Sequence, residues 1–119
     1  MDIFCKIVNN EIPSYTIYED EIIKVFLDVN PNSTGHTLII PKKHYENLFD
    51  IDQNTLNYIL NKSKEIANKL KEKLQCDGIS LCQNNGLGQE VKHYHLHLIP
   101  RYNNEEKLTL EEVYNKLKI

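Results

Sequence analysis

The sequence holds only three cysteines, Cys5, Cys76 and Cys82, and no two of them form a C-x-x-C pair. Three widely spaced cysteines do not build a disulfide framework, and they do not form a zinc module from cysteine alone. Chains without disulfides are typical of reducing compartments, so this pattern predicts a cytoplasmic protein.

Long apolar runs are also missing. No stretch approaches the roughly 20 apolar residues that a membrane-spanning helix needs. Residues 1–12 include Asp2, Lys6 and Glu11, which does not fit a secretory signal peptide. We therefore expect a protein that neither enters a membrane nor is exported.

Positive charge is scarce as well, because 14 Lys and Arg stand against 17 Asp and Glu, for a formal net charge of -3. Affinity for a nucleic-acid backbone comes from clustered Lys and Arg. The composition therefore argues against a polynucleotide partner. A small anionic ligand held by a few local donors remains compatible with it.

The rest of the composition is that of an ordinary globular protein. Hydrophobic residues make up 40% of the 119 residues and charged residues 26%. This length supports one modest core and is too short for two. We expect residues 1–119 to form a single domain.

Helices are expected at both ends and in the middle of the chain. Asp2 can cap a short helix that ends near residue 9, and Thr109 with Glu112 forms a capping box for a short final helix. The longest helix should begin after Asp52 and run to about residue 75, because apolar side chains recur there at helical spacing. Five other segments predict strands, at residues 15–18, 22–28, 36–41, 79–83 and 91–99. Strands joined by short turns are antiparallel, so we expect an α+β fold with an antiparallel sheet, one long helix and short terminal helices.

Three histidines, His93, His95 and His97, alternate along the last expected strand. Alternate residues of a strand share one face at about 6.6 Å per step, so the three imidazoles should point the same way. The outer pair would be about 13 Å apart at the backbone, which is too far for all three to hold one metal ion. A two-histidine metal site completed by His36 or His44 remains open, as do three tolerated surface histidines.

Nucleophilic catalysis at phosphorus is the interpretation that we favour for these histidines. Imidazole titrates near pH 6.5, so a fraction of it is neutral and nucleophilic at physiological pH. The central His95 could attack an α-phosphate and form a nucleotidyl-histidine intermediate that water then hydrolyses. His93 and His97 could stabilise the charge that develops on the phosphate oxygens.

The loop before the histidines suits an anion. Gly86 and Gly88 permit positive φ angles, so the amides of this loop could form a concavity for a phosphate. Gln89 and Glu90 follow closely enough to contact a leaving group or a histidine ring. Both could equally be solvent-facing residues.

The segment from His93 to Ile99 resembles the H-φ-H-φ-H-φ-φ signature of the histidine triad (HIT) family of nucleotide hydrolases and transferases. Other segments resemble the same family in the same order along the chain. They are Phe4–Ile7, Glu11–Pro13, Tyr18–Asp20, Phe26–Asp28, Gly35–His44, Gly88–Gln89 and Pro100–Arg101. The resemblance covers residues 3 to about 102.

This resemblance implies a homodimer that binds a purine nucleotide substrate at the triad and needs no cofactor for the reaction. It makes His95 the nucleophile, with His93, His97 and Gln89 assisting, and Asp28 the ligand of the ribose hydroxyls. Asn84 or Asn85, with Gly88, would contact sugar or phosphate, and His36 would lie behind the triad. The walls of the base pocket would be Ile3, Phe4, Ile7, Phe26, Leu27 and Val29.

Three departures from the family pattern matter, and one of them is a loop between Asn84 and Gln89 that is shorter than in many members. Many bacterial relatives carry a C-x-x-C that joins a later histidine at a structural zinc, and here Asp2 takes the place of the first cysteine. Asp2, Cys5, His44 and possibly His93 are the candidate zinc ligands. Glu90 occupies the place where phosphoramidase-type relatives have Ser or Thr donating to the leaving group. A carboxylate must be protonated to donate, which slightly favours a P–O–P bond over a P–N bond as the one broken.

The sequence therefore leaves three functions open. The first is hydrolysis at the α-phosphate of a nucleoside phosphoramidate or a dinucleoside polyphosphate. The second is a nucleotide- or zinc-binding adaptor with little turnover. The third, transfer of the nucleotide onto a sugar phosphate, needs an acceptor pocket for which 119 residues leave no obvious room.

Overall fold

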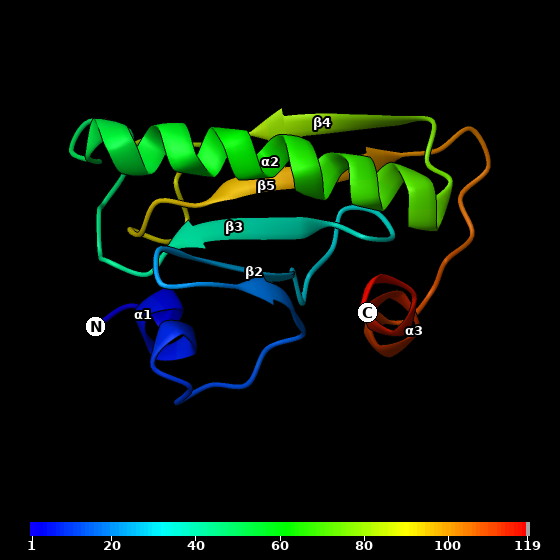
Figure 1. The fold of residues 1–119 in the computed structure, drawn as a ribbon, viewed down its shortest axis with the longest axis horizontal. Helices are drawn as coiled ribbons and strands as arrows, with labels where there is room; N and C mark the ends of the chain where they lie inside the picture. The colour runs from blue at the N-terminus through cyan, green and yellow to red at the C-terminus, as the bar shows by residue number, and fades with distance from the viewer. Residues whose placement is uncertain (119) are drawn as a thin grey trace.

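Five antiparallel strands form one sheet in the spatial order β1-β2-β3-β5-β4 (Figure 1). The computed structural model describes residues 1–118. The strands are β1 (Thr16–Glu19), β2 (Ile23–Leu27), β3 (Thr37–Pro41), β4 (Gly78–Cys82) and β5 (Leu96–Arg101). The first four lie within one residue of the predicted segments, and β3 is central, as its apolar sequence indicates.

Three helices complete the fold: α1 (Ile3–Val8), α2 (Gln53–Leu74) and α3 (Leu110–Leu117). Each begins at the predicted capping residue. Asp2 accepts a hydrogen bond from the Cys5 amide, Asp52 accepts one from the Thr55 amide, and Thr109 forms the full capping box with Glu112. The predicted α+β fold, with one long helix and short helices at the ends, is confirmed.

The helices cover opposite faces of the sheet. Helix α2 runs along one face (Figure 1), where it forms the larger core with α3 and with side chains such as Val25, Ile39 and Leu98. Helix α1 packs on the other face against Phe26, and this smaller cluster also includes Phe4, Ile7, Leu38 and Ile40. Among residues 1–118 no helix is long and apolar enough to cross a membrane.

The predicted strand at residues 91–99 is wrong at its beginning, because β5 starts only at Leu96. Its partner β3 ends at Pro41, which has no backbone N–H to continue the ladder. The Pro41 carbonyl instead accepts a hydrogen bond from the His93 ring, and the Tyr94 amide donates to the Tyr45 carbonyl. The alternation of faces still holds, since Tyr94 joins the larger core while the rings of His93 and His95 pack against Phe4.

Candidate active site

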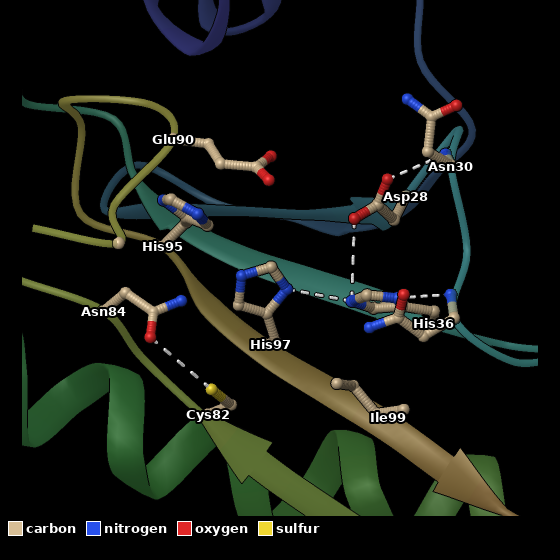
Figure 2. A pocket seen from close by; sticks show the side chains of 11 residues that line it. Asp28, Asn30, His36, Cys82, Asn84, Glu90, His95, His97 and Ile99 are labelled. Atoms are coloured by element: carbon tan, nitrogen blue, oxygen red, sulfur yellow. Dashed lines mark hydrogen bonds and ion pairs between the residues drawn. The ribbon is translucent and has the colours of Figure 1, made fainter.

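Two cavities lie on the α1 side of the sheet and share five lining residues: Asp28, Asn30, Glu90, His95 and His97. The polar cavity has a volume of about 420 Å³ and the apolar cavity about 210 Å³. Figure 2 shows the side chains that line the polar cavity, among them His95, His97 and Asp28. A molecule with an apolar end and a polar end fits this pair of cavities.

The apolar cavity is built by α1, β2 and β3. All six residues expected to wall a base pocket line it: Ile3, Phe4, Ile7, Phe26, Leu27 and Val29. Five further lining residues were not foreseen, namely Ile12, Pro13, Ser14, Leu38 and Val91. Ile12, Pro13 and Ser14 belong to the segment that follows α1 and runs back past the helix. Pro13, which starts this extended segment, was the available signal for them.

His95 is held by the backbone of its own segment. Its Nδ1 lies 2.8 Å from the His93 carbonyl oxygen, which can only accept, so Nδ1 carries the proton and donates. Neutral His95 therefore keeps its lone pair on Nε2. The Phe4 ring packs edge-on against the imidazole with centroids 5.0 Å apart, which restricts its rotation.

A chain of hydrogen bonds sets the protonation of His97. The Asn32 amide donates to Nδ1 of His36 at 3.0 Å, so neutral His36 carries its proton on Nε2. That Nε2 donates to Nδ1 of His97 at 2.9 Å and also lies 3.6 Å from an Asp28 oxygen (Figure 2). Neutral His97 must then carry its own proton on Nε2. The site thus pairs a lone pair on His95 with an N–H donor on His97.

Burial keeps these imidazoles neutral. It lowers the pKa of His36 and of His95 below the usual value for histidine. Burial also lowers the pKa of His97 to about 4, with the positive charges that His95 and His36 would carry acting in the same direction. All three rings are therefore uncharged near neutral pH, which is the form that a nucleophile and a hydrogen-bond relay require.

His93 faces away from the two cavities. Its side chain is fully buried, and Nε2 donates to the Pro41 carbonyl at 2.8 Å. This leaves Nδ1 directed at Asp2, 3.3 Å from Oδ2, and at Cys5, 3.5 Å from Sγ. The contact of His93 with the rest of the triad is thus made by its backbone carbonyl, which orients His95.

The side chains of Asp2, Cys5, His44 and His93 each offer one donor atom, and these four atoms lie within 4.8 Å of one another. One carboxylate oxygen of Asp2 caps α1 while the other faces His44 and His93. An oxygen, a sulfur and two imidazole nitrogens form a donor set that suits zinc, and the Pro41 carbonyl fixes the tautomer that His93 needs as a ligand. A second group, Asp28, His36 and His97, is less suitable because the His36–His97 hydrogen bond already uses its nitrogens.

The glycine–asparagine loop divides into lining and supporting residues. Asn84 and Gly88 line the polar cavity. Gln89 does not, because its buried amide bonds to the Glu46 and Val91 carbonyls and to the Gly86 amide. Asn85 also lies outside both cavities, where its side chain accepts from the Leu48 amide and pairs with Gln83. The positive φ angles expected at Gly86 and Gly88 are present, at 75° and 93°.

Asn30 and Asn32 line the polar cavity and were missed by sequence reasoning. They belong to the turn between β2 and β3, where asparagine is common for conformational reasons alone. The available signal was their position directly after Asp28. The role of Asn32 rests on its backbone amide, which no side-chain pattern reveals.

Known proteins resemble this chain over nearly its whole length. The HIT domain family model matches residues 9–104. An uncharacterized HIT-like protein of Methanocaldococcus jannaschii is 47% identical, over 97% of this chain and 91% of its own. The adenosine 5'-monophosphoramidase of Saccharomyces cerevisiae is 43% identical, over 83% of this chain and 61% of its own. A solved structure, a zinc-bound histidine triad family protein from Mycobacterium smegmatis, matches with a TM-score of 0.90 at 35% identity, over 98% of this chain and 89% of that one.

Proposed function

This chain belongs to the HIT domain family, and we propose that it hydrolyses a purine nucleotide derivative at the α-phosphate through a nucleotidyl-histidine intermediate. The observation that carries the proposal is the 2.8 Å hydrogen bond from Nδ1 of His95 to the His93 carbonyl. It leaves the attacking lone pair on Nε2, the nitrogen that a nucleophilic histidine needs free. The phosphoramidase activity that names the yeast relative supports the same reaction class.

Substrate binding follows from the two cavities. The apolar cavity between α1 and β2 suits a purine base, which offers two flat apolar faces. Asp28 stands where both cavities meet, with one oxygen held by the Asn30 amide at 2.8 Å. Its remaining lone pairs can accept hydrogen bonds from the two ribose hydroxyls. The α-phosphate then reaches His95 and His97 in the polar cavity.

The reaction has two half-steps. Nε2 of His95 attacks the phosphorus, the bond to the leaving group breaks, and the leaving group keeps the bonding pair. The Nε2–H of His97 donates to a phosphate oxygen and stabilises the charge that gathers there. A water then attacks the phosphorus of the nucleotidyl-histidine, the P–Nε2 bond breaks with its electron pair returning to His95, and the second proton of the water passes to solvent.

We further propose that Asp2, Cys5, His44 and His93 hold a structural zinc. The zinc would cross-link α1 to the segment that follows β3 and to the segment that precedes β5. The zinc-bound Mycobacterium smegmatis structure supports this assignment. Adding zinc to metal-free protein should raise the melting temperature, because a ligand that binds only the folded state stabilises it by about 2.7 kcal/mol at 100 times its Kd. Cys5→Ser should abolish the rise and Cys82→Ser should keep it. A melting temperature that does not change when stoichiometric zinc is added would refute the site.

A homodimer is the assembly that we propose. Strand β4 is an edge of the sheet, and both Leu81 on β4 and Leu60 on the adjoining α2 are about half exposed, at 50% and 46%. Pairing two such surfaces would cover them. Light scattering should report a dimer for the wild type and a monomer for Leu81→Glu. A wild type that stays monomeric at every concentration measured would refute it.

The decisive experiment concerns His95. Wild type and His95→Ala are incubated with adenosine phosphoramidate and with a diadenosine polyphosphate, quenched, and measured for turnover and intact mass. The proposal requires turnover and a nucleotidyl adduct on the wild type, both absent in His95→Ala while nucleotide affinity is retained. Hydrolysis that survives His95→Ala overturns the mechanism, and nucleotide binding by the wild type without turnover supports an adaptor instead. A chelator in the same assay should leave turnover intact.

A further inference from the structure

We propose that Glu90 selects a substrate whose leaving group is an amine, against one whose leaving group is a polyphosphate or sulfate. The inference rests on the proposed function and adds the chemical class of the leaving group. Glu90 lines both cavities, together with His95 and Asp28. Figure 2 shows its side chain projecting into the polar cavity beside His95.

The charged side chains that line the two cavities are negative. Of the residues within 1–118 that line them, Asp28 and Glu90 are acidic and none is Lys or Arg. The hydrogen bonds of His36 and His97 fit uncharged rings, since the Asn32 amide donates to Nδ1 of His36 and Nε2 of His36 donates to Nδ1 of His97. The site can therefore offer hydrogen-bond donors to one phosphate, but it holds no fixed positive charge for a second or third.

Basic side chains nearby are engaged elsewhere. Lys92, two residues after Glu90, donates to the Gly86 carbonyl at 3.0 Å. Arg101, at the end of β5, donates to the Ser80 hydroxyl at 3.1 Å. Neither of them lines the two cavities. A leaving group with several negative charges would thus meet the Glu90 carboxylate without a compensating cation.

An amine leaving group would instead be stabilised by Glu90. When Nε2 of His95 bonds to phosphorus and the P–N bond breaks, the bonding pair stays on the nitrogen, which has taken a proton from water. The N–H groups of that nitrogen can donate to Glu90, and the carboxylate stabilises the positive charge that the nitrogen acquires. Water then attacks the phosphorus of the nucleotidyl-histidine and releases one proton to solvent, which replaces the proton that the amine took, and the products are a nucleoside monophosphate and the free amine.

This reverses the preference drawn from the sequence. In the family pattern Glu90 replaces a hydroxyl donor, and an ionised carboxylate cannot donate. In the cavity its charge and its acceptor atoms matter more, because Asp28 is the only other charged side chain among the lining residues of 1–118. The sequence alone does not reveal that the site lacks a lysine or arginine.

The test compares kcat/KM for two adenosine substrates, an alkylamine phosphoramidate and a diadenosine tetraphosphate, with and without Mg²⁺. The wild type should prefer the phosphoramidate. Glu90→Gln, which keeps the shape and removes the charge, should shift the ratio toward the tetraphosphate by about 100-fold, the product of two effects of about tenfold each. High salt should shrink the wild-type preference, because exposed charges are screened. Glu46→Gln, an exposed acid outside both cavities, is the matched control and should leave the ratio unchanged.

The outcomes separate this inference from the function on which it rests. If both substrates form the His95 adduct and Glu90→Gln leaves the ratio unchanged, or if the wild type prefers the tetraphosphate, the role of Glu90 is refuted and the hydrolase stands. If the wild type turns over neither substrate and forms no adduct, both proposals fall. Glu90 is exposed, so a matching melting temperature for Glu90→Gln suffices to show that the variant is folded.

Discussion

His36 donates from its Nε2 to Nδ1 of His97 over 2.9 Å, and the Asn32 amide on the other side of the ring fixes that direction. A histidine outside the triad thus decides which nitrogen of His97 carries a proton. The consequence reaches the cavity, because the N–H of His97 that can meet a phosphate oxygen exists only in this tautomer.

His36→Phe should therefore reduce kcat and change KM little. The ring volume remains, but His97 loses the donor that fixes its tautomer, and loss of one oriented hydrogen bond to a transition state costs about 100- to 1,000-fold. His36→Gln can still present an amide N–H near the same place and should recover part of the rate. ¹⁵N chemical shifts of His97 report the tautomer directly. Wild-type kcat in His36→Phe, or an unchanged tautomer, would contradict the relay.

The neutral histidines also predict how stability depends on pH. The pKa of His97 is about 4 in the folded protein and near 6.5 in an unfolded chain, so the unfolded state binds more protons between these values. Stability should therefore be complete above pH 6.5 and fall as the pH drops toward 4, by about 3 kcal/mol from His97 alone. His36 and His95, whose pKa values are also lowered, act in the same direction.

Urea unfolding between pH 5 and pH 7.5 tests this. Carboxylates titrate below this pH range and so do not contribute to the slope. Asp20 is an example, because burial raises its pKa but hydrogen bonds outweigh that effect and lower the pKa to about 2. His97→Gln should flatten the slope relative to the wild type. A free energy of unfolding that is constant across the window would show that the histidines ionise alike in the folded and unfolded states.

Local signals account for what the sequence predicted well. Each helix cap depends on a hydrogen bond between residues three positions apart, so one short segment of sequence is enough to predict it. The capping residues are Asp2, Asp52 and Thr109. The beginning of β5 is different, because it depends on Pro41 in another strand. Pairing of β5 stops at Leu96, opposite Ile39, two residues before the proline at which β3 ends, and periodicity within residues 91–99 carries no trace of that.

The same distinction explains the site. Alternation placed His95 and His97 correctly on one face, since side-chain direction is a local property of an extended chain. It gave no warning that His93 and Gln89 bond away from the cavities. Gln89 is held by Asn47, 42 residues earlier in the chain, and His93 by Pro41, 52 residues earlier. Contacts of this range follow from the fold and not from the motif.

Lys24 should stabilise α1 and, through it, the apolar cavity. Its ammonium is buried and donates to the Ile7 carbonyl at 2.9 Å and to the Asn10 side chain at 3.2 Å, at the end of α1 where the helix dipole favours a positive charge. Lys24→Met should lower the free energy of unfolding by about 2 kcal/mol, because both acceptors lose their donor.

The same variant should bind a nucleoside monophosphate more weakly, since α1 carries Phe4 and Ile7. Lys64→Met, on the exposed side of α2, is the control and should change stability by less than about 0.5 kcal/mol. Equal stability of the two variants by urea unfolding would show that the Lys24 contacts contribute nothing net.

Alanine substitutions at Gly35 and Gly86 distinguish the cost of backbone strain from the cost of a steric clash. Both have positive φ angles, 92° and 75°, so an alanine at either position strains the backbone by about 1–2 kcal/mol. Apart from Gly86 itself and its two chain neighbours, no heavy atom of the described chain lies within 4 Å of a Cβ added at Gly86, whereas at Gly35 the Cβ would clash with the Leu74 side chain and lie 3.3 Å from Pro100. Gly35→Ala should thus lose about 1–3 kcal/mol more than Gly86→Ala in urea unfolding. Leu74→Ala creates room at this point, so adding it to Gly35→Ala should cost less than Leu74→Ala costs alone. Strict additivity of the two changes would mean that the clash is relieved by movement elsewhere, and that the turn before His36 is not pinned by α2.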